Sequence, residues 1–372
     1  LPHLRAGAAG DPPVSAARAP RAREVATASV PGRICLAGES LDWMTGGNSV
    51  TAAVPLRTRV TAWRAAGSDA LALISGPPLY QTRLVPAARA AASVYDGDVL
   101  DHMQAAARVT LPAAADLAGV VVTASTDLPV GAGVSSSASL TLAVVAALAA
   151  LQHGGAPGTA DACTLARQAE TGELGTGAGW MDFLACASGG VNQVSAGTRP
   201  HAALITASLG LPVVLIDTRQ RRATATVLAS KRERFQAREP AMIAYVAETA
   251  ALVEALTSVL HSPQPDYREA GRLLSAAHAL LRDQVACSTP LIEECVSRVL
   301  AAGAYGAKLS GSGHGGCLFA LVPDDAVAAV LASVADLPVH AVALPRSDPA
   351  GLVCAPPASA PPAARQDAAR PA

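Results

Sequence analysis

The chain has 372 residues and a formal net charge of −1, from 28 Lys and Arg against 29 Asp and Glu. This balance excludes the strongly basic surface that nucleic-acid binding requires, and the length predicts roughly two domains, each with room for a hydrophobic core. Seven scattered cysteines with no Cys-x-x-Cys pair favour a reducing, cytoplasmic compartment over a disulfide-bonded secreted protein.

The two ends of the chain differ in composition from its middle. Residues 1–25 are rich in Ala, Arg and Pro and lack the apolar core of a secretory signal. Residues 349–372 are rich in Pro and Ala, and both ends are expected to be disordered tails. Between the tails, residues 26–205 and residues 206–348 are expected to form two domains.

The first half of the chain combines strands with two helices. Its longest uncharged stretch, Val134 to Leu151, contains four Ser and one Thr, which predicts a buried helix over residues 136–152 rather than a membrane span. A second helix is predicted over residues 161–172. β-branched residues and partial alternation predict strands over residues 26–40, 48–65, 117–129, 189–195, 201–207 and 211–218.

The second half is more helical. A helix is predicted from Pro290 to Gly303, because Pro is favoured at the first position of a helix and Gly just after its end. A strand is predicted over residues 339–345. Because strands and helices do not alternate regularly, the α+β class is favoured over a doubly wound sheet. Apolar residues at helical spacing predict the other helices, over residues 232–260, 266–283 and 324–336.

A Gly- and Ser-rich segment, PVGAGVSSSAS, leads into the helix predicted from residue 136. Gly131 and Gly133 would let the backbone approach phosphate oxygens closely, and a helix N-terminus favours an anion. No Gly-Lys-Ser/Thr follows, so the segment is not a Walker A loop. The alternative is a Ser-rich helix cap without a ligand.

A second glycine loop, SGSGHGG, spans Ser310 to Gly316. It contains G-x-G-x-x-G, but a strand is expected after it where a dinucleotide fingerprint needs a helix. The loop is therefore interpreted as a strand–loop–strand unit that closes on a small ligand, with a long hairpin turn as the alternative.

Two further segments carry charged residues among glycines. PGRICLAGESLDW places Arg33, Glu39 and Asp42 around a strand end and a turn. AETGELGTGAGWMDF carries Glu170 and, after a Gly-rich connection, Asp182.

Three of these segments together resemble the GHMP kinases, the family of galactokinase, homoserine kinase and mevalonate kinase. The first motif resembles PGRICLAGESLDW, the second PVGAGVSSSAS and the third KLSGSGHGGC, in the same order, and the resemblance covers residues 28–345. It implies a two-domain α+β fold, in which an N-terminal domain like domain 2 of ribosomal protein S5 precedes a ferredoxin-like α/β sandwich.

Within the family, the sequence is similar to the sugar-kinase branch. Arg33, Glu39 and Asp42 fit the galactokinase pattern, as does the interval between Glu170 and Asp182. Galactokinases have His where this chain has Ser40, so galactose itself is not implied.

The resemblance assigns roles to these residues. Asp182 would face the acceptor hydroxyl with Arg33 beside it, and Glu170 with Ser137 would hold Mg²⁺. Glu39, Ser40 and Asp42 would contact the substrate. The ATP phosphates would be bound by Gly131, Gly133, Ser135, Ser136, Ser137, Ser139, Gly311 and Gly313.

The implied activity is ATP- and Mg²⁺-dependent phosphorylation of a sugar, most simply at the anomeric hydroxyl. Two alternatives remain open, which are another alcohol acceptor related to mevalonate or homoserine, and a non-catalytic sugar sensor. The expected partners are small molecules, without nucleic acid or membrane, and the oligomeric state is not predicted. His102 is expected on a helix surface, without a role.

Overall fold

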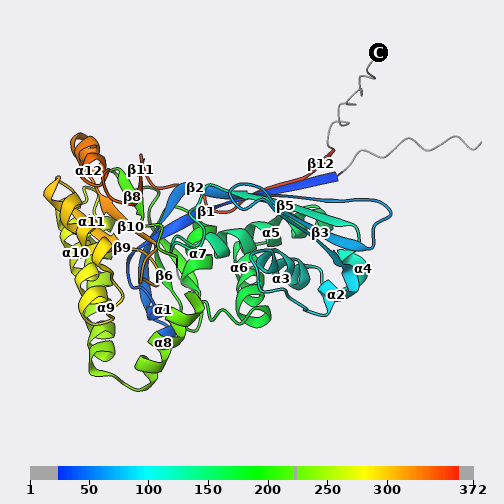
Figure 1. Cartoon of the computed structure of the whole chain (residues 1–372), viewed down its shortest axis with the longest axis horizontal. Coiled ribbons are helices and arrows are strands. Elements are labelled where there is room, and N and C mark those ends of the chain that lie inside the picture. Colours follow the sequence, from blue (N-terminus) through cyan, green and yellow to red (C-terminus); the bar gives the residue numbers. More distant parts are fainter. Residues whose placement is uncertain (1–23, 222–223, 360–372) are drawn as a thin grey trace, which may run out of the picture.

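The computed structural model describes residues 24–221 and 224–359 and contains two sheets, each covered by helices on one face (Figure 1). The expected α+β class is confirmed. The first sheet has the order β12-β1-β2-β5-β3-β4, and β6 and β7 extend it from β2. Its strands are β1 (Glu24–Ala37), β2 (Asn48–Arg64), β3 (Ala70–Ser75), β4 (Gln81–Pro86), β5 (Val120–Thr126), β6 (Val191–Ser195), β7 (His201–Thr206) and β12 (Val353–Ser359).

Helices cover one face of the first sheet and enclose its apolar core. The central helix of this layer is α5 (Ser136–His153), which packs on β1 and β2. It is apolar on nearly all sides and ends at Gly154, which takes the left-handed conformation (φ 78°) that glycine adopts without strain. The remaining helices of this part are α1 (Leu41–Met44), α2 (Ala87–Ala91), α3 (Leu100–Thr110), α4 (Ala114–Leu117), α6 (Thr159–Gln168), the π-helical turn η1 (Ala169–Glu173) and α7 (Met181–Ser188).

The second sheet is antiparallel, with the order β11-β8-β10-β9. Its strands are β8 (Val213–Asp217), β9 (Gly306–Leu309), β10 (Cys317–Leu321) and β11 (His340–Leu344). A separate group of helices lies beside it at the other end of the molecule (Figure 1), comprising α8 (Thr224–Gln236), α9 (Pro240–His261), α10 (Tyr267–Asp283), α11 (Pro290–Ala301), the 3₁₀ turn η2 (Asp324–Ala326) and α12 (Val327–Ser333).

Two of these helices begin as their sequences indicate. The Asp266 side chain accepts hydrogen bonds from the backbone N–H groups of Arg268 and Glu269 in α10, and the Thr289 hydroxyl accepts one from the N–H of Ile292 in α11, which begins at Pro290. Such caps satisfy N–H groups that have no partner within the helix.

The expectation of a disordered C-terminal tail from residue 349 is wrong for residues 349–359. Here β12 pairs with β1 in antiparallel register, with Ser29 opposite Val353. A composition rich in Pro and Ala suggests disorder. An edge strand tolerates Pro, however, because the backbone groups on its outer side form no hydrogen bonds with a neighbouring strand. Residues 1–23 and 360–372 lie outside the described residues, and the expected domain boundary near residue 205 stays a prediction.

The single helix expected over residues 232–260 is also wrong. The chain forms α8 and α9 instead, separated at residues 237–239, because Arg238 is left-handed (φ 53°) and Pro240 begins a new helix. The second predicted helix ends early as well, since α6 passes into the π-helical turn η1 at Ala169.

Two helices in the described ranges are long and apolar enough to span a membrane, α5 and α9. The buried share is 67% for α5 and 28% for α9. The expectation of a buried core helix at residues 136–152 is therefore confirmed for α5.

Helix α10 approaches strand β9 closely because glycine faces glycine. A Cβ on Gly306 would lie 2.0 Å from the carbonyl oxygen of Gly271, and a Cβ on Gly271 would lie 2.3 Å from that of Tyr305. Only the absence of side chains permits this contact.

Gly306→Ala is therefore expected to destabilise the protein by about 3 kcal/mol, because the backbone of α10 or β9 must move to admit the methyl group. The free energy of unfolding from denaturant titration measures this loss. The matched control is Gly155→Ala, where a Cβ meets nothing within 4 Å, and its expected change is within about 0.5 kcal/mol. Equal effects of the two substitutions would contradict the close approach.

Candidate active site

A cavity of about 400 Å³ gathers most of the residues that the sequence singled out. They come from β1, from the turn before α5, from η1, from α7 and from the loop after β9, which lie far apart in the chain. The predicted residues that line the cavity are Arg33, Glu39, Ser40, Asp42, Gly131, Gly133, Ser135, Ser136, Ser137, Glu170, Asp182 and Gly311.

The glycine loop before α5 lines the cavity with Gly131, Gly133 and Ser135. Gly131, Gly133 and Ser135 all have positive φ (66°, 85° and 61°), and the Ser135 side chain does not cap the helix. The alternative of a Ser-rich helix cap is not seen as a capping hydrogen bond, although the Gly131 N–H donates to the Ser136 hydroxyl within the loop at 3.1 Å. The Ser135 side chain accepts no hydrogen bond from the first turn of α5. The N–H groups of that turn therefore suit the N-terminus of α5 to bind an anion.

Two residues predicted to bind phosphate do not line the cavity. The Ser139 hydroxyl is fully buried and donates a hydrogen bond to the Val30 carbonyl (2.9 Å), which ties α5 to β1. Gly313 packs against Cys287, whose carbonyl oxygen would lie 2.4 Å from a Cβ at that position. Both predictions are corrected, because each residue is engaged in packing behind its loop.

Arg33 connects the glycine loop to Asp182. Its guanidinium is buried (3% exposed), and Nη1 donates to the Gly133 carbonyl at 2.7 Å. Nε and Nη2 donate to Oδ1 of Asp182 at 2.9 and 2.6 Å. Burial acts to lower the pKa of Arg33, but the Asp182 carboxylate, with smaller contributions from Cys35 and Cys186, raises that pKa above its ordinary value.

The Asp182 carboxylate is open to the cavity on its other side. Asp182 lies in the first turn of α7 and is 32% exposed. Within residues 24–221 and 224–359, both of its hydrogen bonds with Arg33 involve Oδ1. Oδ2 is therefore available to a ligand.

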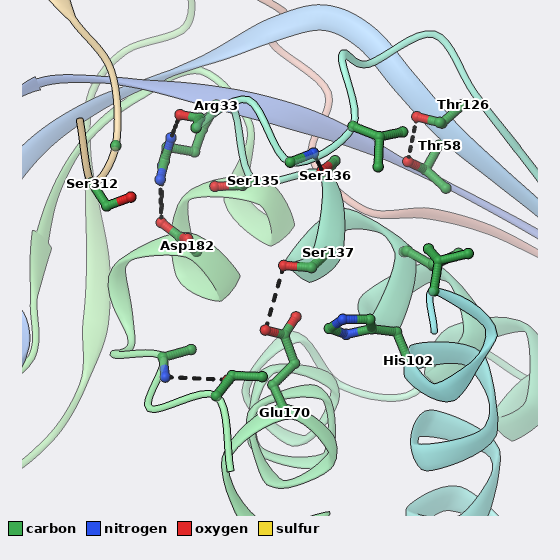
Figure 2. A pocket seen from close by; sticks show the side chains of 18 of the residues that line it. Arg33, Thr58, His102, Thr126, Ser135, Ser136, Ser137, Glu170, Asp182 and Ser312 are labelled. Carbon is green, nitrogen blue, oxygen red and sulfur yellow. Dashed lines mark hydrogen bonds and ion pairs between the residues drawn. The ribbon is translucent and has the colours of Figure 1, made fainter. Parts of the chain in front are cut away.

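Ser137 and Glu170 form a pair of oxygen donors at the cavity wall (Figure 2). The Ser137 hydroxyl donates to Oε2 of Glu170 at 3.4 Å, and the Thr141 hydroxyl lies 3.4 Å from Oε1. Burial, with a smaller contribution from the charge of Asp182, raises the pKa of Glu170 to about 8. The pair lies in the π-helical turn η1 and the first turn of α5.

This donor pair fits Mg²⁺ when phosphate oxygens complete the coordination. Mg²⁺ prefers hard oxygen ligands and is held in many sites by one or two carboxylates together with substrate phosphates. In the described part of the chain no group of three or more His, Cys, Asp or Glu side chains could hold a metal ion. An ion at Ser137 and Glu170 would therefore depend on the nucleotide.

Glu39 has a partner that sequence reasoning missed. Its carboxylate forms an ion pair with Lys308 of β9, and both side chains are buried. The Lys308 ammonium also donates to the carbonyl oxygens of Cys35 (3.1 Å) and Leu309 (2.9 Å), while burial lowers its pKa. Lys308 stands in the third motif, KLSGSGHGGC, but its partner is distant in sequence and no local pattern indicates it.

Asp42 lies between the first motif and α7. Its carboxylate accepts hydrogen bonds from the backbone N–H groups of Trp43 (2.9 Å) and Met181 (3.2 Å). Burial and the charge of Asp182 together raise the pKa of Asp42. Ser40 precedes it with φ 69° and lines the same cavity.

The opposite end of the cavity was not anticipated. It is formed by the start of α3, by Thr58 within β2 and by the ends of β3 and β5. His102 is part of this wall, so the expectation that it lies on a helix surface is wrong. The other residues here are Thr58, Ser75, Pro77, Leu79, Val99, Leu100, Met103, Ala124, Ser125, Thr126 and Leu140.

Comparisons with known proteins agree with the geometry. The family model described as GHMP kinases N terminal domain matches residues 98–190, and that described as GHMP kinases C terminal matches residues 252–339. Mevalonate kinases of Thermococcus onnurineus and Pyrococcus abyssi are each 30% identical to the chain over 209 and 230 residues. These matches cover 55% and 61% of this chain, and only 60% and 66% of the relatives' own length.

Solved structures of two activities share the fold. The Methanococcus jannaschii mevalonate kinase has a TM-score of 0.72 at 17% identity, over 88% of this chain and 99% of that one. The Lactococcus lactis galactokinase in complex with galactose has a TM-score of 0.73 at 22% identity, over 88% and 95%. These identities are low, so the likeness concerns the fold and does not separate the branches.

The sequence relatives are mevalonate kinases, so the expected sugar-kinase branch stays a prediction. The two-domain fold implied by the three motifs is confirmed. The motifs, their convergence on one cavity and the matches to both family models lead to the same conclusion: the chain is similar to the GHMP kinases in both halves of its fold.

Proposed function

We propose that this chain is an ATP-dependent kinase that transfers a phosphoryl group to a hydroxyl group of a small molecule. The observation that carries the proposal is the position of Asp182, which Arg33 holds beside the Gly133 carbonyl of the glycine loop. A carboxylate that can accept a proton thus lies next to a loop that can bind phosphate. In phosphoryl transfer the protein mainly aligns the acceptor hydroxyl with the phosphoryl group and neutralises charge.

The glycine loop and the N-terminus of α5 are suited to hold the phosphates of ATP. Gly131 leaves open space where a side chain would stand, and its positive φ is one that glycine adopts without strain. Gly311 of the second glycine loop approaches Gly133 so closely that a Cβ there would lie 2.8 Å from its Cα. The two loops together would enclose the phosphates.

Mg²⁺, when bound, neutralises phosphate charge and orients the transferred group. For this chain, Ser137 and Glu170 would hold it. Burial and, to a smaller extent, the charge of Asp182 raise the pKa of Glu170, and a bound divalent ion would stabilise the charged form of this carboxylate.

Asp182 would orient the acceptor hydroxyl and receive its proton through Oδ2. Arg33 holds the carboxylate through Oδ1. The same guanidinium lies at the edge of the glycine loop, where it would also offset negative charge on the transferred phosphoryl group.

The acceptor that the relatives support is a hydroxy acid related to mevalonate, since the sequence relatives are mevalonate kinases. A sugar is the second candidate and rests on Asp42, a cavity carboxylate suited to accept bonds from hydroxyl groups. Glu39, the other carboxylate expected to bind a diol, is already paired with Lys308. This pairing weakens the sugar hypothesis.

Asp182→Asn is expected to lower kcat by about 10²- to 10⁴-fold, because the amide cannot accept the hydroxyl proton. The affinity for ATP should change little, since Asp182 lies at the acceptor side of the loop. Steady-state kinetics and calorimetric titration with ATP measure the two quantities. Retained turnover would remove Asp182 from its role.

Glu170→Gln is expected to raise the Mg²⁺ concentration for half-maximal activity by at least about 10-fold, because the hard anionic ligand is lost. Activity measured during Mg²⁺ titration at fixed ATP checks this. Asp325→Asn, at an exposed carboxylate of η2, is the control and should leave the titration unchanged. An unchanged midpoint in Glu170→Gln would contradict the metal assignment.

A panel of acceptors distinguishes the functions. ADP release from ATP is measured with mevalonate, homoserine, galactose and other free sugars, and mevalonate is expected to give a kcat/KM at least about 10-fold above galactose, as a pocket built for one acceptor discriminates. A higher value for a sugar would establish the second candidate. ATP or sugar binding without turnover of any acceptor would favour the non-catalytic sensor, against which the presence of Arg33, Glu170 and Asp182 argues.

A further inference from the structure

His102 occupies a position between two different parts of the cavity. Figure 2 shows its ring, which projects from α3, next to Glu170 and on the side of the Ser137–Glu170 pair that is away from Asp182. Beyond it the wall has an apolar part with Val99, Leu100, Met103 and Leu140, and a hydroxyl-bearing part with Thr58, Ser75, Ser125 and Thr126. The imidazole thus stands where the charged part of the cavity passes into a compartment lined by uncharged side chains.

The His102 ring has unused hydrogen-bonding capacity. Its Nδ1 atom is buried and has no hydrogen-bond partner in the part of the chain that the structure describes. Burial lowers its pKa, although the neighbouring Asp101 acts in the opposite direction. A neutral imidazole carries one donor and one acceptor, and a buried polar atom without a partner has a free-energy cost. Because Nδ1 has almost no accessible surface, a ligand relieves this cost when the ring turns and brings that atom to the cavity.

The proposed location of the phosphates determines which part of ATP passes this ring. If the phosphates lie at the N-terminus of α5 and the acceptor lies at Asp182, the rest of the nucleotide extends away from Asp182. It then passes Ser137 and Glu170 and enters the compartment at α3. The apolar wall suits a purine base, and the unit that joins base to phosphates is the ribose, which carries two hydroxyl groups.

We propose that His102 forms a hydrogen bond with a ribose hydroxyl of bound ATP and thereby makes the site select ribonucleotides over deoxyribonucleotides. This inference rests on the proposed function, because it takes the position of the phosphates from it. His102 acts here as a specificity-determining residue and takes no part in the transfer step. Its contribution is confined to the nucleotide side of the cavity.

The test measures binding without an acceptor, so that it does not depend on turnover. Calorimetric titrations with ATP, 2′-deoxy-ATP and 3′-deoxy-ATP in excess Mg²⁺ give the dissociation constants. The wild-type chain should bind ATP about 3- to 10-fold more tightly than at least one deoxy analogue, the effect of one neutral hydrogen bond. His102→Phe, which keeps a ring but loses both nitrogens, should bring this ratio to about 1.

A matched control is Met103→Leu, which changes the neighbouring apolar residue of the same wall. It should keep the wild-type preference for ATP even if all three affinities shift together. His102→Asn, whose shorter side chain still offers a donor and an acceptor, should keep more of the preference than His102→Phe. Thermal unfolding of each variant without nucleotide separates loss of the contact from loss of folding.

Several outcomes would overturn the inference. Equal binding of the three nucleotides by the wild-type chain would exclude a ribose contact. An equal loss of affinity for all three in His102→Phe would instead place the ring on a phosphate or on the metal pair. Absence of ATP binding altogether would overturn the proposed function as well, whereas ATP binding without ribose discrimination would overturn this inference alone.

Discussion

The buried guanidinium of Arg33 is the contact on which the rest of the site depends. The guanidinium donates to the Gly133 carbonyl and to Asp182. The backbone N–H of Arg33 donates to the Val134 carbonyl at 3.2 Å. The Ser310 hydroxyl also donates to the Gly133 carbonyl, at 2.9 Å. A single backbone carbonyl therefore connects β1, the loop before α5 and the loop after β9. The planar, forked guanidinium can hold two partners at once, which a lysine could not do in the same geometry.

Much of the site could be predicted from the sequence because its signals are local. Gly131, Gly133 and Gly311 stand in short glycine patterns before a helix or after a strand, and the motif order carried the family resemblance and the fold. Lys308 and His102 gave no such signal, since a buried ion pair and a cavity wall arise from contacts between distant segments. Ser139 shows the converse error, because its helical position turns a hydroxyl of the motif away from the cavity and toward Val30.

The charged side chains of the cavity differ in how completely they are paired. Glu39 and Lys308 neutralise each other in the interior, and loss of one partner would leave an uncompensated buried charge. Arg33 and Asp182 are paired through one carboxylate oxygen only. Glu170 has hydroxyl groups beside it and Asp42 accepts backbone hydrogen bonds, and neither carboxylate forms an ion pair with the described residues. The cavity thus combines one closed ion pair, one half-open pair and two carboxylates outside ion pairs, of which Glu170 is suited to a metal.

The pairing of β12 with β1 has a consequence for biosynthesis. Strand β1, which carries Arg33, begins the described chain, whereas β12 ends it after the whole second sheet has been formed. During translation the outer edge of β1 consequently remains an unpaired row of N–H and C=O groups until residues 353–359 have been synthesised. Such an edge can pair with other chains, so the nascent protein is exposed to aggregation until β12 has paired with β1.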